Sequence, residues 1–422
     1  MNLHESVFWQ ETVSWPVAEE AAPLPTKVEV AIIGGGYTGL AAARTLAQHG
    51  VRVAVLEAHT FGWGASSRNG GMVLSGLKLS APAVLQKYGR GLARRLFQCS
   101  LEAISTVEQI IDEEHIACGF ARQGHLLVAS KPGDQRALQE EAEVLEKEFN
   151  HPVRLLAANE LKDEIDSEIY FGGLLDESSG GLNPAQYVVG LSHAARKAGA
   201  SLHARARVTR LGRSLNRFVI ETERGPVQAE RVLVATAGYT DSLIPYLNRR
   251  ILPIGSFIIA TENLGEQVQA LIPRQRMVFD SRHYLNYFRL WDGRLIFGGR
   301  AAFFPETSGT IRRSAEILRQ EMLRVFPQLK GAQVEFAWGG TLDFARDLMP
   351  HVGEHAGVVY ALGYAGHGVA LGTFLGKTVA EAMLKDNLRE HPFAAYSFPL
   401  APKFPLALPL AGLWYRLLDW IE

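Results

Sequence analysis

The apolar residues near the start of the chain follow a pattern that predicts one complete β-α-β unit. Val28–Ile33 is a short run rich in β-branched residues, typical of a strand buried on both faces. Residues 40–49 (LAAARTLAQH) have the character of a helix, and Gly50 ends it. Val51–Leu56 follows as a second apolar run. This order predicts two parallel strands joined by a crossover helix.

The rest of the chain alternates between helical and strand-like patterns. Helices are predicted over residues 91–116, 134–149, 185–199 and 310–326, and after a glycine-rich turn from about residue 373 to 385. Strands are predicted over residues 202–211, 218–222, 231–236 and 358–362, with several more between 251 and 300. A strand–glycine–helix sequence thus returns near the end of the chain, far from the first unit.

We therefore predict a fold that combines α/β and α+β parts, in which a Rossmann-type nucleotide-binding domain is assembled from separated segments around an inserted mixed-sheet substrate domain. The nucleotide-binding domain would comprise residues 28–82, 178–250 and 340–386. The substrate domain would comprise residues 83–177 and 251–339. An N-terminal arm (1–27) and an apolar C-terminal tail (387–422) complete the chain.

The end of the tail is apolar from Phe404 to Ile421, with Trp414, Leu417 and Leu418 on one helical face. Three placements are open for it: against its own protein, against a second subunit of a homo-oligomer, or on a membrane surface.

Composition limits the classes of function. The 43 Lys and Arg residues nearly balance the 44 Asp and Glu residues, so no general attraction to nucleic acid is expected. The 2 cysteines, Cys99 and Cys118, fit a reducing compartment and offer no metal-site spacing. The N-terminus lacks the pattern of a secretory signal, and no apolar run is long enough to span a membrane. We expect a cytoplasmic protein without a bound metal.

The first motif that carries chemistry is a G-x-G-x-x-G sequence, Gly34 to Gly39, between the first strand and its helix. Such glycines allow a tight turn, close approach of a pyrophosphate, and close packing of helix on strand. Glu57 ends the second strand, where an acidic side chain can bond ribose hydroxyls. The whole unit predicts dinucleotide binding.

Two further segments bear on which dinucleotide is bound. Residues 64–71 (GASSRNGG) combine small residues with the donor Arg68, which suits a loop over phosphates and a flat ring; a flexible loop with one surface arginine is the alternative. Residues 363–369 (GYAGHGV) precede a helix whose N-terminal dipole would face a ligand, with a plain glycine-rich turn as the alternative. Residues 232–238 (VLVATAG) match, more weakly, a strand and turn of two-domain flavoproteins.

Together these motifs resemble the D-amino acid oxidase (DAO) family of FAD-dependent oxidoreductases, in particular its branch with glycine oxidase and γ-glutamylputrescine oxidase. The resemblance covers roughly residues 28–386. It implies an extended FAD whose isoalloxazine ring lies at the domain boundary. The cofactor-binding residues that it implies are Gly34, Gly36, Tyr37, Thr38, Gly39, Glu57, Ala58, Gly64, Ser66, Ser67, Arg68, Asn69, Gly70, Gly71, Met72, Val208, Gly238, Gly363, Gly366, His367, Gly368 and Val369.

The sequence departs from the family pattern in ways that concern the substrate. Family members that oxidise α-amino acids place an arginine shortly after a Trp-x-Gly segment, whereas here residues 338–343 read WGGTLD and the next arginine is Arg346. This difference favours an amine or a γ-glutamyl-amine-like substrate over an α-amino acid. A glycine frequent in the family is Val369 here, and no cysteine stands at a family attachment position, so FAD is expected to bind without a covalent link.

The resemblance implies hydride transfer from the carbon that bears nitrogen to FAD, giving an imine that water hydrolyses. Oxygen would be the electron acceptor and hydrogen peroxide the product; the alternative is a dehydrogenase that passes electrons to a quinone or a partner protein. The catalytic candidates are His367, Tyr287 and Trp338, each of which has a structural role as its alternative. Arg289 would pair with a substrate carboxylate or, alternatively, form a surface or structural salt bridge.

Overall fold

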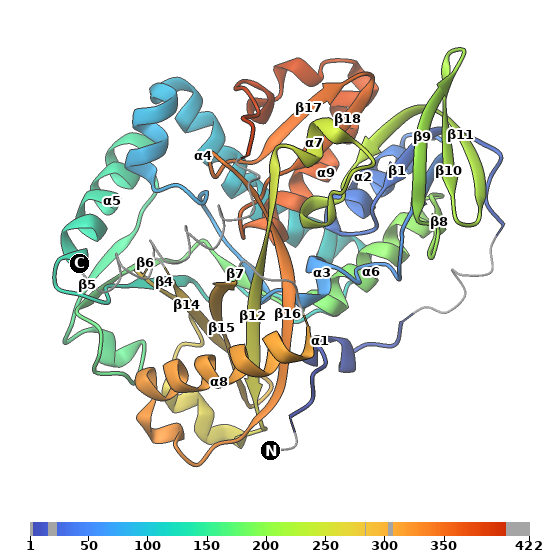
Figure 1. Ribbon diagram of the computed structural model, residues 1–422. Coiled ribbons are helices and arrows are strands. Elements are labelled where there is room, and N and C mark those ends of the chain that lie inside the picture. Colours follow the sequence, from blue (N-terminus) through green and yellow to red (C-terminus); the bar gives the residue numbers. More distant parts are fainter. Residues whose placement is uncertain (1–2, 16–22, 283, 303–306, 402–422) are drawn as a thin grey trace.

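Most of the chain is organised around two large sheets (Figure 1). The computed structural model describes residues 3–15, 23–282, 284–302 and 307–401. The first sheet has the strand order β17-β18-β11-β1-β2-β8, and a β9–β10 hairpin extends it from β11. Its strands are β1 (Lys27–Ile33), β2 (Val53–Leu56), β8 (Ser201–His203), β9 (Val208–Ser214), β10 (Arg217–Thr222), β11 (Gly225–Val234), β17 (His351–His355) and β18 (Val358–Leu362).

The strands β1, β2, β8, β11 and β18 run parallel, as the β-α-β pattern predicts. The strands β2 and β18 are wholly buried, because side chains on the two faces of the sheet pack in two separate apolar clusters. The covering helices are α2 (Tyr37–Gln48), α4 (Ala81–Glu114), α6 (Pro184–Lys197) and α9 (Gly368–Lys385).

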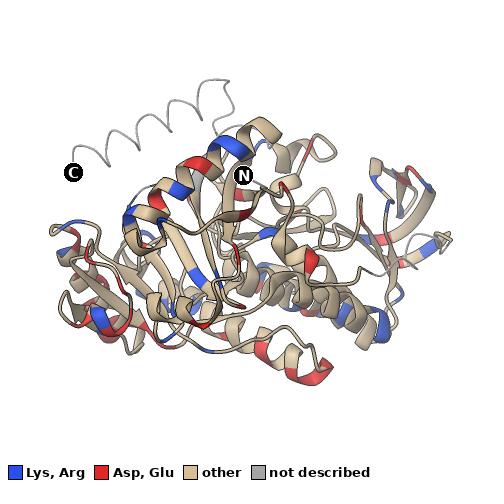
Figure 2. Ribbon diagram, turned by 90° about the horizontal axis from the view of Figure 1, so that it is seen from below, with Lys and Arg blue, Asp and Glu red and all other residues tan. Residues whose placement is uncertain are grey.

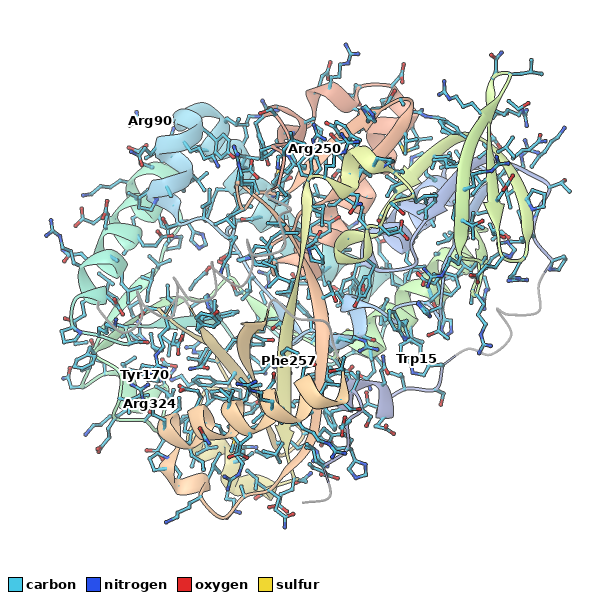
Figure 3. All side chains as sticks on the ribbon, viewed as in Figure 1. Trp15, Arg90, Tyr170, Arg250, Phe257 and Arg324 are labelled. Carbon is cyan, nitrogen blue, oxygen red and sulfur yellow. The ribbon has the colours of Figure 1, made fainter. Side chains whose placement is uncertain are left out.

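The second sheet is mixed and has the strand order β16-β12-β15-β14-β13-β4-β6-β5. Its strands are β4 (His125–Val128), β5 (Arg154–Ala157), β6 (Gly172–Asp176), β12 (Ile251–Thr261), β13 (Met277–Asp280), β14 (Asn286–Trp291), β15 (Arg294–Ala302) and β16 (Val334–Ala345). The amphipathic helix α8 (Ser308–Val325) covers one face through Ile311, Leu318 and Met322, and Phe257 of β12 packs in the same core (Figure 3). Ile258, Ile296 and Trp338 of this sheet pack instead in a cluster with the N-terminal arm.

Shorter elements connect these layers. They are α1 (Phe8–Glu11), α3 (Ala65–Arg68), α5 (Asp134–Phe149), α7 (Pro245–Asn248), the paired strands β3 (Met72–Val73) and β7 (Gly180–Gly181), and the 3₁₀ helices η2 (Leu161–Asp163), η3 (Ala237–Tyr239), η4 (Gly265–Leu271), η5 (Pro327–Leu329), η6 (Leu388–Glu390) and η7 (Pro392–Ala394). The arm is anchored by Trp9, which is fully buried beside the second sheet. The segment that follows α9 is anchored by Phe398, whose carbonyl accepts a hydrogen bond from Arg250.

Two predicted boundaries are wrong for identifiable reasons. The last helix begins at Gly368, not near Thr373, because the glycines taken for a turn belong to its first turns and pack on α2: a Cβ on Gly372 would lie 3.2 Å from the Thr38 hydroxyl oxygen. The strand predicted over 202–211 is interrupted after His203. There Arg205 adopts a φ of 50°, and the Ala206 amide donates to the Glu57 carbonyl. This interruption ties the chain to the end of β2.

The helix predicted over 91–116 is longer than expected. It begins at Ala81 behind the Ser80 cap and Pro82, and its backbone is non-helical at Gly89. The predicted domain boundary at 340 lies inside β16, which keeps residues 340–345 in the second sheet.

Acidic and basic side chains alternate over the helices instead of collecting on one face (Figure 2). Within the described ranges, no helix is long and apolar enough to cross a membrane. The apolar stretch 404–421 lies outside the described residues.

Candidate active site

The site is assembled where the parallel strands of the first sheet end. Ile33 of β1 pairs in register with Leu56 of β2 and Val234 of β11. The residues that follow these strands therefore meet at one edge of the sheet. Open α/β sheets bind their ligands at this carboxyl edge.

The turn after β1 requires glycine for steric reasons. Gly34 has a φ of 109°, and a Cβ there would lie 2.6 Å from the Ala235 carbonyl oxygen. A Cβ on Gly39 would lie 2.0 Å from the Gly34 carbonyl oxygen, so the helix α2 can pack this closely only with glycine. Gly36 is the N-cap of α2 and provides no side-chain cap. The first helical amide of α2, that of Tyr37, donates to the Ser66 hydroxyl instead.

A second helix N-terminus lies beside the first. The helix α9 begins at Gly368 without a side-chain cap, since the N-cap residue His367 makes no capping bond. A 2.7 Å hydrogen bond between the Thr38 and Tyr364 hydroxyls joins α2 to the turn before α9, and a Cβ on Gly372 of α9 would lie 3.2 Å from the Thr38 hydroxyl oxygen. Gly366 in the preceding turn is exposed, and an added Cβ there would meet nothing within 4 Å. Two neighbouring helix N-termini thus lie at this edge of the sheet, an arrangement that suits a diphosphate.

Glu57 lies at the end of β2, as the sequence predicts. Its carboxylate accepts hydrogen bonds from the Gly35 amide at 2.7 Å and the His59 amide at 2.8 Å. Burial raises the pKa of this carboxyl group, and the backbone bonds oppose that shift. Ala58 follows in the same turn, and Val208 begins β9 nearby, where the Ala206 amide bonds the Glu57 carbonyl.

The loop from Gly64 to Met72 closes one side of the site. The Ser66 hydroxyl accepts from the Tyr37 amide at 3.1 Å, which brings α3 to the start of α2. The Arg68 guanidinium donates to the Trp63 and Gly339 carbonyls, and Trp338 donates its indole N–H to the Arg68 carbonyl at 2.9 Å. These bonds join the loop to β16 of the second sheet.

The other loop candidates are held by internal bonds. Asn69 accepts from the Gly71 amide at 2.7 Å, and the indole of Trp9 donates to the Asn69 carbonyl. Ser67 is fully buried and accepts from the Gln10 side chain. A Cβ on Gly64 would strike the ring of Tyr239, and one on Gly238 would strike the backbone of residues 341–342. The loop is therefore fixed by the N-terminal arm and by the second sheet.

The second sheet offers an aromatic face to this loop. The ring of Tyr287 lies 3.1 Å from where a Cβ of Gly70 would stand, and its hydroxyl is 3.2 Å from that of Ser256. Met72, Leu74 and Met277 form a small apolar cluster against Tyr287 and Phe279. His367 lies at the start of α9, where burial, aided by the charge of Lys78, lowers its pKa to about 3. The imidazole is therefore neutral at physiological pH.

Comparison with known proteins assigns the chain to a protein family. The family model described as "DAO: FAD dependent oxidoreductase" matches residues 29–382. The chain belongs to this family. It is 34% identical to the γ-glutamylputrescine oxidoreductase of Escherichia coli over 94% of both chains. It is 25% identical to the glycine oxidase of Geobacillus kaustophilus over 89% of this chain and 96% of that protein. The crystal structure of glycine oxidase from that organism shares the fold, with a TM-score of 0.73, 22% identity, and coverage of 91% of this chain and 98% of the other.

The residues present fit the FAD that the DAO family binds. The two neighbouring helix N-termini, whose N-cap residues make no side-chain cap, suit its pyrophosphate, Glu57 follows the second strand as a ribose-binding acid would, and the exposed turn at Gly366 leaves backbone accessible. Both cysteines are buried, and burial raises the pKa of Cys99 to about 12 and that of Cys118 to about 11. Neither is a reactive thiolate.

The position of Arg289 corrects the surface or salt-bridge interpretation. The side chain is 1% exposed, and it has no ion pair among the described residues. Its guanidinium donates to the Gly71 carbonyl at 2.8 Å and the Leu182 carbonyl at 3.0 Å. Burial lowers its pKa to about 10, so it remains charged. Arg289 of β14 therefore holds the loop at Gly71 through a buried hydrogen bond.

Asp343 is the residue of this DAO site that the sequence analysis did not single out. It is fully buried and accepts from the Gly363 amide at 2.6 Å, while its carbonyl accepts from the Ala365 amide. It thus holds the turn that leads to His367 and α9. The only sequence signal was an acidic residue at the end of a strand pattern, which is too common to be diagnostic.

Asp343 makes stability depend on pH. Burial raises its pKa to about 7, well above the value of the unfolded chain, so its protonation stabilises the fold at low pH and this contribution is lost as pH rises through 7. We expect the wild type to gain about 2 kcal/mol from this group between pH 8 and pH 5, and Asp343→Asn to lack that gain. Urea unfolding of both proteins at the two pH values measures this gain in stability. If the stability of the two proteins changed equally between these pH values, the gain could not come from Asp343.

Proposed function

We propose that this chain oxidises the C–N bond of a small amine, with FAD bound non-covalently at the carboxyl edge of the first sheet. The observation that carries the proposal is the pairing of the α2 and α9 N-termini at this edge, next to a loop whose Gly70 borders the Tyr287 ring of the second sheet. Bound FAD would supply a hydride acceptor for the carbon that bears nitrogen, and water would hydrolyse the imine product.

The chain's own residues would provide a dry and oriented site. The cluster of Met72, Leu74 and Met277 with Phe279 and Tyr287 forms an apolar wall, which disfavours the ammonium form of an amine and so keeps its lone pair free. His367 would orient the substrate through a neutral ring nitrogen, and Tyr287 through its hydroxyl. Trp338 would act by holding Arg68 and its loop, since its indole N–H is engaged there.

The substrate class follows from what the site lacks. Leu342 and Asp343 stand after the Trp-Gly-Gly segment, and Asp343 is bonded to backbone, so no guanidinium clamp for an α-carboxylate arises from this strand. The similarity to γ-glutamylputrescine oxidoreductase also supports an amine substrate over a free α-amino acid. We propose a γ-glutamyl amine or a related amine as the substrate, in preference to a free α-amino acid.

A reduction experiment tests this proposal. The purified protein, loaded with FAD, is mixed without oxygen with γ-glutamylputrescine, putrescine, glycine and sarcosine, and flavin absorbance near 450 nm is followed. We expect fast bleaching by γ-glutamylputrescine and slow or no bleaching by glycine and sarcosine. Faster reduction by the two α-amino acids would overturn the substrate class. A folded protein that cannot be made yellow by added FAD would overturn the function itself.

The electron acceptor is tested in the same samples. We propose that oxygen is the acceptor. Admitting air to the reduced protein should then restore the yellow colour and release one hydrogen peroxide for each flavin that is reoxidised. Slow recovery in air with fast recovery on adding a soluble quinone would favour a dehydrogenase instead.

A further inference from the structure

A cavity of about 500 Å³ lies between the helix α8 and the turn that joins β13 to β14. The turn after β4 completes its wall. The volume falls within the range of about 300–1,000 Å³ that is usual for small-molecule sites. None of the described residues that line it is among the cofactor-binding residues that the family resemblance implies. The cavity is therefore distinct from the cofactor site.

The strand β14 separates this cavity from the cofactor loop. Asn286, the first residue of β14, lines the cavity, and Phe288 packs in the core that α8 covers. Between them, Tyr287 borders Gly70 of the cofactor loop. Successive side chains of a strand point to opposite faces of the sheet. The cavity therefore lies on the face of β14 that is turned away from the cofactor loop.

The walls of this cavity are mainly basic. Four positively charged side chains from three separate segments line it: Lys131, Arg282, Arg313 and Arg324. Glu321 is the acidic residue among the described lining residues, and its carboxylate lies 2.7 Å from the Arg282 guanidinium and 4.0 Å from that of Arg324. The positive charges therefore exceed the negative charge beside them. A cleft with an excess of one sign of charge attracts ligands of the opposite sign.

The two turns that border the cavity are held in place by the protein itself. The buried Asp280 carboxylate accepts from the backbone amide of Asn286 at 2.8 Å and from its side-chain amide at 2.9 Å, and it lies 3.8 Å from the Arg282 guanidinium. Even when Asp280 is counted, the basic side chains outnumber the acidic ones. The Ser130 amide donates to the Ser281 hydroxyl at 2.9 Å, which joins the turn after β4 to the turn after β13. The basic walls are therefore fixed without a ligand, as a preorganised site requires.

Two groups in the walls lack a partner. The hydroxyl oxygen of Ser130 is buried and has no hydrogen-bond partner among the described residues. Rotation about its Cα–Cβ bond turns this hydroxyl toward a ligand, which would supply the missing acceptor. Arg313 is exposed on α8 and forms no hydrogen bond or ion pair with another described residue. Both groups are thus available as donors to a bound anion.

We propose that this cavity binds a small molecule with at least two oxyanion groups, of the phosphate or carboxylate type. The planar guanidinium groups of Arg282, Arg313 and Arg324 match the geometry of such oxygens. A single anionic group would leave most of the surrounding cations unpaired, whereas two or more groups can bridge the turns and α8. The site goes beyond the proposed function, because it lies across β14 from the cofactor loop.

Calorimetry tests whether the protein binds such anions. FAD-loaded protein in a phosphate-free buffer is titrated at one fixed ionic strength with pyrophosphate, citrate and acetate, and the bound FAD keeps pyrophosphate out of the cofactor site. We expect pyrophosphate or citrate to bind at least about 10-fold more tightly than acetate, since each further hydrogen bond to a charged group contributes this much. The tighter of the two identifies the ligand as a phosphate compound or a polycarboxylate. If none of the three binds, or if all bind equally, the proposal is wrong.

Variants test whether the anion binds in this cavity. Arg313→Gln should weaken binding of the preferred anion about 10- to 100-fold, and Ser130→Ala about 3- to 10-fold. Ser130→Ala should not lower the stability of the protein without the anion, because its hydroxyl has no partner to lose.

Arg52→Gln is the matched control, since Arg52 is an exposed arginine that pairs with Glu29 in the first sheet. This variant should bind the anion as wild type does. An Arg313→Gln protein with wild-type affinity, or an Arg52→Gln protein weakened to the same extent, would show that the anion binds elsewhere and would overturn the assignment. These outcomes are independent of the proposed function, which flavin reduction tests.

Discussion

Replacing Gly39 by valine is expected to abolish FAD binding and to destabilise the protein by about 4 kcal/mol or more. A Cβ at this position would lie 2.0 Å from the carbonyl oxygen and 3.1 Å from the carbonyl carbon of Gly34. Both are backbone atoms at the end of a central strand, so neither can move without disturbing the pairing of β1 with β2 and β11. The α2 N-terminus would be displaced from the edge of the sheet, and with it the N–H groups that face the pyrophosphate.

Absorbance near 450 nm of the purified variant and its urea unfolding curve measure the two effects of Gly39→Val. Gly91→Ala is the control, because Gly91 lies in α4 and an added Cβ there meets nothing within 4 Å. That variant should stay yellow and should be as stable as wild type or more stable, by about 0.5–1 kcal/mol. A Gly39→Val protein that is yellow and as stable as wild type would contradict the packing argument.

Replacing Trp338 by alanine is expected to cost about 3–5 kcal/mol of stability, the range for removing a large buried aromatic side chain. Trp338 is 1% exposed and packs in the cluster of Trp9, Ile258 and Phe336 between the second sheet and the N-terminal arm. Its indole N–H also bonds the Arg68 carbonyl, so the substitution loosens the loop of the cofactor site. We therefore expect weaker FAD binding together with lower stability.

Trp338→Phe separates this structural role from a catalytic one. The phenyl ring keeps most of the packing and loses the bond to Arg68, so about 1–3 kcal/mol of stability should be lost and FAD should dissociate more readily. Once saturated with FAD, the variant should reduce its flavin at nearly the wild-type rate. A stable, FAD-saturated Trp338→Phe protein with a strongly reduced rate would show that Trp338 acts in the chemistry.

The roles of Trp338 and Arg289 show why the function of a side chain is harder to predict than a helix or a strand. Both residues stand in strands with an alternating apolar pattern. Such a pattern indicates that a side chain is buried, but it does not indicate which residues surround it. Trp338 turned out to hold a loop through its indole N–H, and Arg289 holds the same loop through backbone carbonyls. Neither bond has a signal in the local sequence, because each partner lies more than two hundred residues away.

The sequence by itself determined the β-α-β unit, the glycines of its turn, the amphipathic helix α8 and the strand β18, because each depends on local periodicity or on backbone sterics within a few residues. Glu57 belongs with them, since its place is set by the end of β2. Only the tertiary structure decided that α9 begins at Gly368, where contact with α2 outweighs the poor helix propensity of glycine.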